Sequence, residues 1–178
     1  MTPQRTQRMG KQAKAVGPDQ STSGRNTKSL EEFLWNIISI SSDFEEISFV
    51  WAQMLGITLH QWMILMAIKD LDRGDGVSVK VVSAQMHSDP SVVTAQSKSL
   101  EKHGFLRRVS SSEDARVVLM SLTDKASKNI AALHSNRESI RGAIFSDLSD
   151  RDLRDLNEKL STLRERFRKA AKRLAAEL

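Results

Sequence analysis

The sequence predicts a mainly α-helical fold with one small β element, and three patterns lead to this prediction. Apolar residues recur at spacings of three and four near both ends of the chain, from Phe33 to Met54 and from Leu153 to Leu174, as they do along amphipathic helices. A helix with a sharp start at Asp89 and Pro90 occupies the middle of the chain. Two stretches of β type, separated by the polar turn SSSED, follow it directly.

Length and composition limit the class of protein. A chain of 178 residues fits one domain with an added oligomerisation element. Cysteine is absent, which excludes disulfides, Cys-ligated zinc and thiol redox chemistry. No apolar segment of a secretion signal follows the basic N-terminus, and no run of about 18 apolar residues occurs, so we expect a cytoplasmic protein with no membrane contact.

Positive charge is concentrated at the N-terminus. Residues 1–28 contain six basic residues and a single acid, Asp19, whereas the remainder of the chain is neutral overall. Because this segment is polar and holds few apolar residues, we expect residues 1–28 to form a disordered basic tail. The tail is either a solvated extension or a segment that contacts a polyanion such as DNA.

A long helix is predicted from Ser29 onward, because Ser29 and Glu32 have the spacing of a capping box. Gly56 ends this helix, and Thr58 with Gln61 begins the next one, which reaches about Leu71. The apolar seam of the first helix consists of Phe33, Ile37, Ile40, Phe44, Ile47, Trp51 and Met54. Further apolar residues widen this face, so the helix must pack against more than one neighbour.

Two short elements precede the central helix. The DRGDG turn ends the second helix, and a short strand at 77–79 and a helix at 79–86 follow it. The four-residue connection HSDP then leads into the helix from Asp89 to Gly104. This is the spacing of a helix-turn-helix.

The helix from Asp89 to Gly104 has two unlike faces. Val93, Ser97 and Leu100 form a thin stripe that we expect to be buried. The opposite face is small and basic, and consists of Ser91, Ala95, Lys98 and Lys102. Such a face fits the major groove of DNA, where short side chains let the backbone approach the bases, although a merely solvated helix has similar features.

The two β-type stretches, 105–109 and 116–122, are predicted to form a two-stranded ribbon. The order helix, helix, strand, turn, strand is that of a winged helix-turn-helix. We therefore assign residues 58–122 to a winged-helix DNA-binding domain, flanked by long helices at both ends.

Two long helices close the chain. Thr123 begins one that we expect to run without a break to about Phe145, and Ser149 with Asp152 begins the last. The seam of the last helix keeps its three-four alternation for more than three heptads, which predicts a partner helix. The alternative is a helix packed only within its own chain. We expect residues 29–57 and 123–176 to form a helical dimerisation region.

Four stretches resemble the MarR family of bacterial transcriptional regulators, namely ITLHQW, DPSVVTAQSKSLEKHGFLRR, SSEDAR and VVLMSLTDKA. The resemblance implies a homodimer that binds double-stranded DNA. It also implies that a wing-tip Asp pairs with an Arg that enters the minor groove, and these positions are Asp114 and Arg116 here. The chain departs from the family at Ala95, where members often carry Arg, so we expect the wing and DNA shape to supply part of the specificity.

The stretches DPSVVTAQSKSLEK and SSEDARVV also resemble a branch of that family that regulates aromatic-acid breakdown. This second resemblance implies a small-molecule effector that is an aromatic acid or an aromatic coenzyme A thioester such as p-coumaroyl-CoA. We therefore expect a repressor that binds an inverted repeat and is released by the effector. The alternative is a helical protein-interaction module in which the winged helix is only structural.

The predicted site residues fall into two groups. The DNA-binding group lies on the central helix and the ribbon and consists of Ser91, Val92, Thr94, Ala95, Lys98, Lys102, Arg107, Arg108, Asp114 and Arg116. The effector group consists of Trp35, Ile38, Ser42, Phe49, Trp51, His60, Trp62 and Met66, although Trp and Met at helical spacing are also typical of a core. The four histidines have no metal-ligand spacing and no catalytic motif occurs, so we expect no metal, no cofactor and no enzyme activity.

Overall fold

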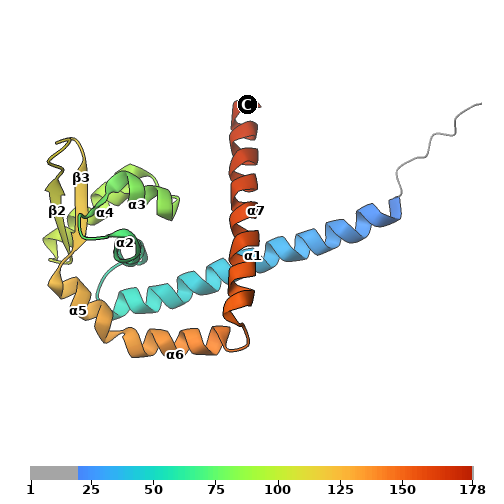
Figure 1. The fold of residues 1–178 in the computed structure, drawn as a ribbon, viewed down its shortest axis with the longest axis horizontal. Helices are drawn as coiled ribbons and strands as arrows, with labels where there is room; N and C mark the ends of the chain where they lie inside the picture. Colours follow the sequence, from blue (N-terminus) through green and yellow to red (C-terminus); the bar gives the residue numbers. More distant parts are fainter. Residues whose placement is uncertain (1–19, 178) are drawn as a thin grey trace, which may run out of the picture.

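The computed structural model describes the backbone of residues 20–177 and the side chains of residues 27–177. The fold is mainly helical with a small antiparallel sheet, as predicted (Figure 1). Its elements are α1 (Gln20–Met54), α2 (Leu59–Leu71), β1 (Val77–Ser78), α3 (Val79–Met86), α4 (Pro90–Lys102), β2 (Leu106–Ser110), β3 (Val118–Leu122), α5 (Asp124–Ala132), α6 (His134–Phe145) and α7 (Asp150–Glu177).

The sheet has three strands in the order β1-β3-β2, all antiparallel. The predicted ribbon is confirmed in β2 and β3, and β1 adds a short third strand through the pairing of Val77 with Met120. Strand β3 begins two residues later than predicted. The reason is that the backbone N–H of Val117 donates to the carbonyl oxygen of Asp114, which keeps this segment in the turn.

The core is centred on the winged helix, and α1 and α5 add Trp51, Ala52, Ala126 and Ile130 to it. Trp62, Ile68, Val82, Leu100 and Met120 are fully buried and come from α2, α3, α4 and β3. Each of these elements buries the apolar face that its spacing predicts. The core therefore positions α4 with one face inside and the other face free.

Local signals set the helix starts inside this domain. Thr58 and Gln61 form a complete capping box at α2. The carboxylate of Asp89 accepts a hydrogen bond of 2.7 Å from the backbone N–H of Ser91 at the start of α4, and Pro90 occupies the first turn. Gly104 adopts a φ of +74° after the helix, a conformation that glycine reaches without strain.

Helix α1 corrects the prediction at the N-terminal end. It begins at Gln20 rather than at Ser29, so the spacing of Ser29 and Glu32 does not mark its start, and residues 20–28 are helical rather than disordered. The sequence has no proline between Pro18 and Pro90, and extending an existing helix is far easier than nucleating one. The rest of the predicted tail, residues 1–19, lies outside the described residues.

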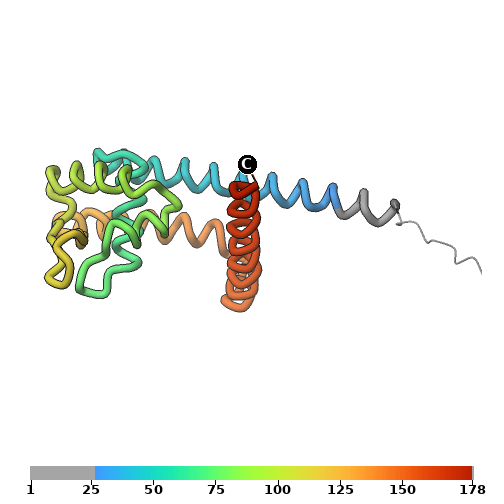
Figure 2. Tube along the Cα trace, turned by 90° about the horizontal axis from the view of Figure 1, so that it is seen from above, coloured from blue at the N-terminus to red at the C-terminus, as the bar shows by residue number. Residues whose placement is uncertain are grey.

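The helix predicted from Thr123 to Phe145 is instead two helices, α5 and α6, that meet at Leu133. The Leu133 side chain is buried in the core with Ile130, and its N–H bonds back to Ile130 in a tightened turn. This segment has no Gly or Pro before Gly142, so no local breaker marks the bend. Core packing of Leu133 turns the chain, and α6 then runs beside α1 (Figures 1 and 2).

The last helix lies steeply across α1 and faces α3 of the winged helix across a groove lined by residues that include Val81, Gln85 and Phe167 (Figure 1). Its predicted start at Ser149 with Asp152 is confirmed, because the Asp152 carboxylate accepts from the N–H of Ser149 and the Asp152 N–H donates to the Ser149 hydroxyl oxygen, which is a capping box. Its apolar seam is exposed, with Phe167 at 56% and Leu174 at 62%. Within residues 20–177, no single helix is long and apolar enough to cross a membrane, and α1 from Thr27 reaches that composition only together with α2, which it meets at 94°.

Candidate nucleic-acid interface and adjoining cavity

Helix α4 presents the predicted face to solvent. Val93, Ser97 and Leu100 are completely buried against the core. The exposed residues of the helix include Ser91, Val92, Ala95, Lys98 and Lys102, and Thr94 is half-buried beside them. The structure thus brings the helical members of the predicted DNA-binding group together on the solvent-facing side of α4.

The wing turn contains the next two predicted residues. Asp114 and Arg116 are both exposed at its tip. The Asp114 carboxylate accepts a hydrogen bond of 2.9 Å from the backbone N–H of Arg116. No ion pair in residues 27–177 includes the Arg116 guanidinium, so Asp114 shapes the turn instead of holding the side chain as expected.

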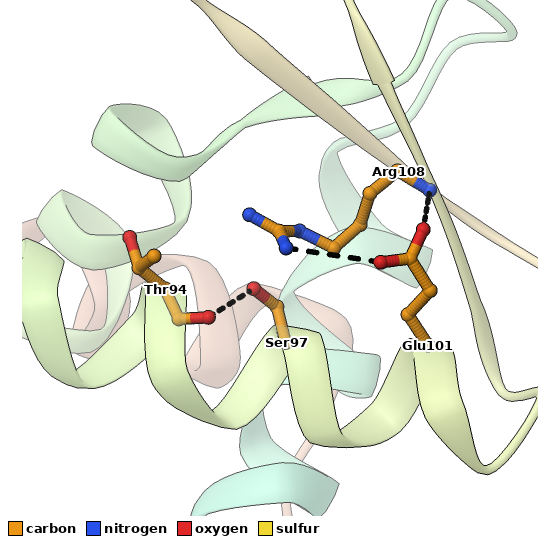
Figure 3. A network of polar contacts seen from close by, with 4 residues as sticks. All are labelled: Thr94, Ser97, Glu101 and Arg108. Atoms are coloured by element: carbon orange, nitrogen blue, oxygen red, sulfur yellow. Dashed lines mark hydrogen bonds and ion pairs between the residues drawn. The ribbon is translucent and has the colours of Figure 1, made fainter.

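The neighbouring arginines Arg107 and Arg108 lie on opposite faces of strand β2, although both were predicted to contact DNA. Arg107 is exposed, but the Arg108 side chain is only 10% exposed and lies over α4 (Figure 3). Successive residues of a strand point to opposite faces, which is why the two neighbours differ. Arg108 is therefore not the free surface cation that was expected.

The carboxylate at the start of α4 stays ionised. Hydrogen bonds from Ser91, from its hydroxyl first and from its backbone N–H second, lower the pKa of Asp89 below its ordinary value. A negative charge at a helix N-terminus is also stabilised by the helix dipole. The first turn of α4 is thereby fixed, and its neighbouring side chains are held in place.

A cavity of about 480 Å³ opens between α1, α2 and α6. Its walls are mostly apolar, and include Ile40, Phe44, Ile47, Trp51, Trp62, Met66, Ile140, Ile144 and Phe145. Four polar residues complete them, namely Asp43, Ser48, Arg137 and Arg141. An apolar pocket of this size with a few convergent polar groups is typical of small-molecule sites.

Two tryptophans and one arginine form the inner wall of the cavity. The rings of Trp51 and Trp62 are 5.8 Å apart, and the Arg137 guanidinium carbon lies 5.6 Å and 5.5 Å from their centroids. The indole N–H of Trp51 donates to the Asn136 side chain at 2.9 Å. Burial, followed by the nearby charge of Arg141, lowers the pKa of Arg137.

Two of the residues that line the cavity carry a polar atom without a hydrogen-bond partner among residues 27–177. The hydroxyl of Ser48 and the Nε of Arg137 are buried and form no hydrogen bond within residues 27–177. A buried polar group without a partner costs free energy, so a ligand that satisfies both atoms gains affinity.

The predicted effector group is only partly assembled. Trp51, Trp62 and Met66 line the cavity, whereas His60 lies exposed on the first turn of α2. The other four, Trp35, Ile38, Ser42 and Phe49, are exposed and do not line it. At about 100° per residue they lie roughly opposite the cavity-lining face of α1.

Sequence reasoning missed Asp43, Ser48, Arg137 and Arg141. The spacing of Arg137 and Arg141, four residues apart on a predicted helix, places both cations on one face. Asp43 and Ser48 gave no such signal, because they are single polar residues in a long apolar seam.

One side chain connects the cavity region to α4. Gln61, buried beside the cavity-lining Trp62, accepts from the N–H of Thr58 through Oε1 and donates through Nε2 to the hydroxyl of Ser99, at 3.1 Å in each case. The start of α2 and helix α4 are thus joined by one amide.

Among the side chains of residues 27–177, no group of three or more His, Asp or Glu residues is arranged to hold a metal ion.

Comparison with known proteins agrees with this geometry. Residues 57–118 match the sequence profile described as the MarR family. The chain is 33% identical to the organic hydroperoxide resistance transcriptional regulator of Bacillus subtilis (strain 168) over 113 residues, which cover 62% of this chain and 72% of that protein.

Two solved structures have the same fold. The S. aureus MepR–DNA complex has a TM-score of 0.64 at 16% identity, and covers 76% of this chain and 96% of its own. The regulator BldR from Sulfolobus solfataricus has a TM-score of 0.62 at 20% identity, and covers 79% of this chain and 97% of its own. Sequence and fold together establish that the chain belongs to the MarR family, whose members are DNA-binding transcriptional regulators and not enzymes.

Proposed function

We propose that this protein is a repressor that binds an inverted repeat in double-stranded DNA as a homodimer and is released by a small aromatic effector. The observation that carries the proposal is the exposed small and basic face of α4, which is backed by a fully buried stripe and flanked by the wing that bears Arg116. A rigid helix with short side chains enters the major groove, and a guanidinium on a hairpin suits the minor groove.

The helical arms, α1, α6 and α7, support a homodimer. Their apolar seams are exposed in the single chain, including Phe44 on α1 and Leu160 on α7. Their charges are complementary: residues 27–54 hold five acids and one base, and residues 164–173 hold six bases and one acid. A second copy related by a two-fold axis would pair unlike charges in the way that favours one register.

A two-fold dimer sets the geometry of the DNA site. Two copies of α4 about 34 Å apart would read successive major grooves, so the site is an inverted repeat. Lys98, Lys102 and Arg107 supply phosphate contacts, which add affinity and salt dependence without reading sequence. Ser91, Val92, Thr94 and Ala95 meet the base edges.

The DNA proposal is tested with a duplex that the wild-type protein selects from a random library. Arg116→Ala should weaken specific binding by roughly 1–3 kcal/mol. Arg151→Ala is the matched control, because it removes an exposed arginine at the start of α7. An unchanged affinity for Arg116→Ala removes the wing from the interface. Absent or salt-insensitive binding by the wild type would favour a helical protein-interaction module instead.

The cavity supports an aromatic carboxylate as the effector. Trp51 and Trp62 present aromatic faces, and the Arg137 guanidinium beside both rings supplies positive charge for an anion. The volume accommodates one aromatic acid, so the nucleotide part of a coenzyme A thioester would lie outside it. An effector that widens the gap between α1 and α6 would favour a spacing of the α4 helices that no longer fits DNA.

Calorimetry with p-coumaric acid and its coenzyme A thioester tests the effector proposal. Arg137→Met should reduce the affinity for the acid at least tenfold, as expected for one lost charge-assisted hydrogen bond. Trp35→Ala is the control, because Trp35 lies on the far face of α1. Binding of neither compound would remove this effector class and leave the DNA proposal intact.

A further inference from the structure

A single carboxylate on α4 contacts the first strand of the wing, β2. Both oxygens of Glu101, in the last turn of α4, face Arg108 of β2 (Figure 3). Oε1 accepts from the backbone N–H of Arg108 at 3.1 Å, and Oε2 lies 3.8 Å from its Nη1. The carboxylate thus fixes the backbone and the side chain of the same residue.

Burial sets Arg108 apart from the other cations of this surface. Its guanidinium lies over the turn of α4 that bears Ser97, on the side facing Thr94, and its Nε is buried with no hydrogen bond within residues 27–177 (Figure 3). The Glu101 side chain keeps 43% exposure, so the pair lies at the edge of the interface and not in the core. An arginine held in this way is poorly placed for a phosphate, whereas the exposed Arg107 beside it is well placed.

We infer that Glu101 and Arg108 are positioning residues that fix the angle between α4 and the wing, so that both elements engage one DNA duplex at the same time. The inference rests on the proposed DNA-binding function. The duplex is bound in both grooves at once only if α4 and the wing keep one relative orientation. A displacement of about 1 Å in either element would weaken the contacts that the other one makes possible. We call this pair the clasp.

The clasp and ordinary electrostatics predict opposite changes in DNA affinity when Glu101 is neutralised. Neutralising an acid near DNA removes repulsion from phosphates and tightens binding. Glu101→Gln keeps an oxygen that can accept from the Arg108 N–H but loses the charge that holds the guanidinium. If the clasp positions the wing, this variant binds the selected duplex more weakly, by roughly tenfold, because the ion pair between Oε2 and Nη1 is lost and the partly buried guanidinium keeps no partner charge.

Salt dependence separates positioning from phosphate contact. We expect Arg107→Met to lower the slope of log affinity against log salt concentration by about 0.9, as one lost phosphate contact does. Arg108→Met should weaken binding about as much as Glu101→Gln while leaving the slope unchanged. Hydroxyl-radical footprints of both clasp variants should lose the minor-groove protection from the wing before the major-groove protection from α4.

The double variant Glu101→Gln/Arg108→Met guards against misfolding, since it leaves no unpaired buried charge. It should bind the duplex about as weakly as either single variant. Unchanged or tighter binding by Glu101→Gln overturns the inference, and so does a slope that falls by about one in Arg108→Met. If the wild-type protein selects no duplex, the proposed function fails before the clasp is reached.

Discussion

The winged helix and the helical arms place the same kinds of residue in opposite surroundings. In the winged helix, Trp62 is 1% exposed, and Leu65 and Ile68 are completely buried. On α1, Ile40 is 67% exposed and Phe44 is 52% exposed. One half completes its core within the chain, whereas the other leaves its apolar seam open. The difference indicates that the buried core holds the winged helix together, and that the arms carry apolar surface which the proposed second copy would cover.

Disrupting the apolar seam of the helical arms should give the largest effect, on the oligomeric state and on DNA affinity. Replacing Leu160 and Phe167 with Glu places charges in the seam of α7, so the proposed dimer should dissociate into monomers at micromolar concentration. DNA affinity should fall roughly 10²- to 10⁴-fold, because the two half-sites are no longer bound together. Sedimentation velocity and a shift assay measure the two effects.

The control for this double variant is Ser161→Glu, which adds a negative charge at an exposed position outside the seam of the same helix. A dimer that survives both seam substitutions would show that α7 lies outside the interface.

Breaking the winged-helix core should have the next largest effect. Leu100→Ala removes a completely buried side chain between α4 and the core, and should lower the free energy of unfolding by about 2–5 kcal/mol. Val92→Ala, on the exposed face of the same helix, should change it by less than about 0.5 kcal/mol. Urea titration measures both. Similar losses would mean that α4 does not have two unlike faces.

Acidification should give the smallest change in stability. It affects one carboxylate cap in each region, Asp89 in the winged helix and Asp152 in the arms. Hydrogen bonds from Ser91 lower the pKa of Asp89, and hydrogen bonds from Ser149 lower the pKa of Asp152. The folded form therefore takes up these protons less readily than the unfolded chain. Their stabilisation is present at neutral pH, and is lost as the pH falls below the ordinary value of 3.8 through the folded-state pKa.

Asp89→Asn and Asp152→Asn test this effect separately. The difference in unfolding midpoint between each variant and the wild type should shrink between pH 6 and pH 3. A constant difference over that range would show that the cap does not act through its charge.

Local chemistry was readable from the sequence, and long-range packing was not. Asp89, Pro90 and the Thr58–Gln61 pair act within a few residues, so the starts of α4 and α2 were predicted correctly. Leu133 bends the chain through contacts with distant elements, and nothing in the local sequence marks that bend.

Ambiguous periodicity caused the errors at the cavity. Helix α1 is apolar on two faces, and spacing alone does not decide whether Trp35 or Phe44 faces the cavity. The same limit applies to Arg108, whose burial follows from the register of β2 against β3.

The bend at Leu133 makes α6 a lever arm. Its near end is anchored in the winged-helix core, and its far end, at Phe145, forms part of the cavity wall. A helix of 12 residues is about 18 Å long, so a rotation of about 5° at the bend moves the far end by roughly 1.5 Å. The position of Leu133 therefore sets how far a small rotation of α6 would move Phe145 and this side of the cavity wall.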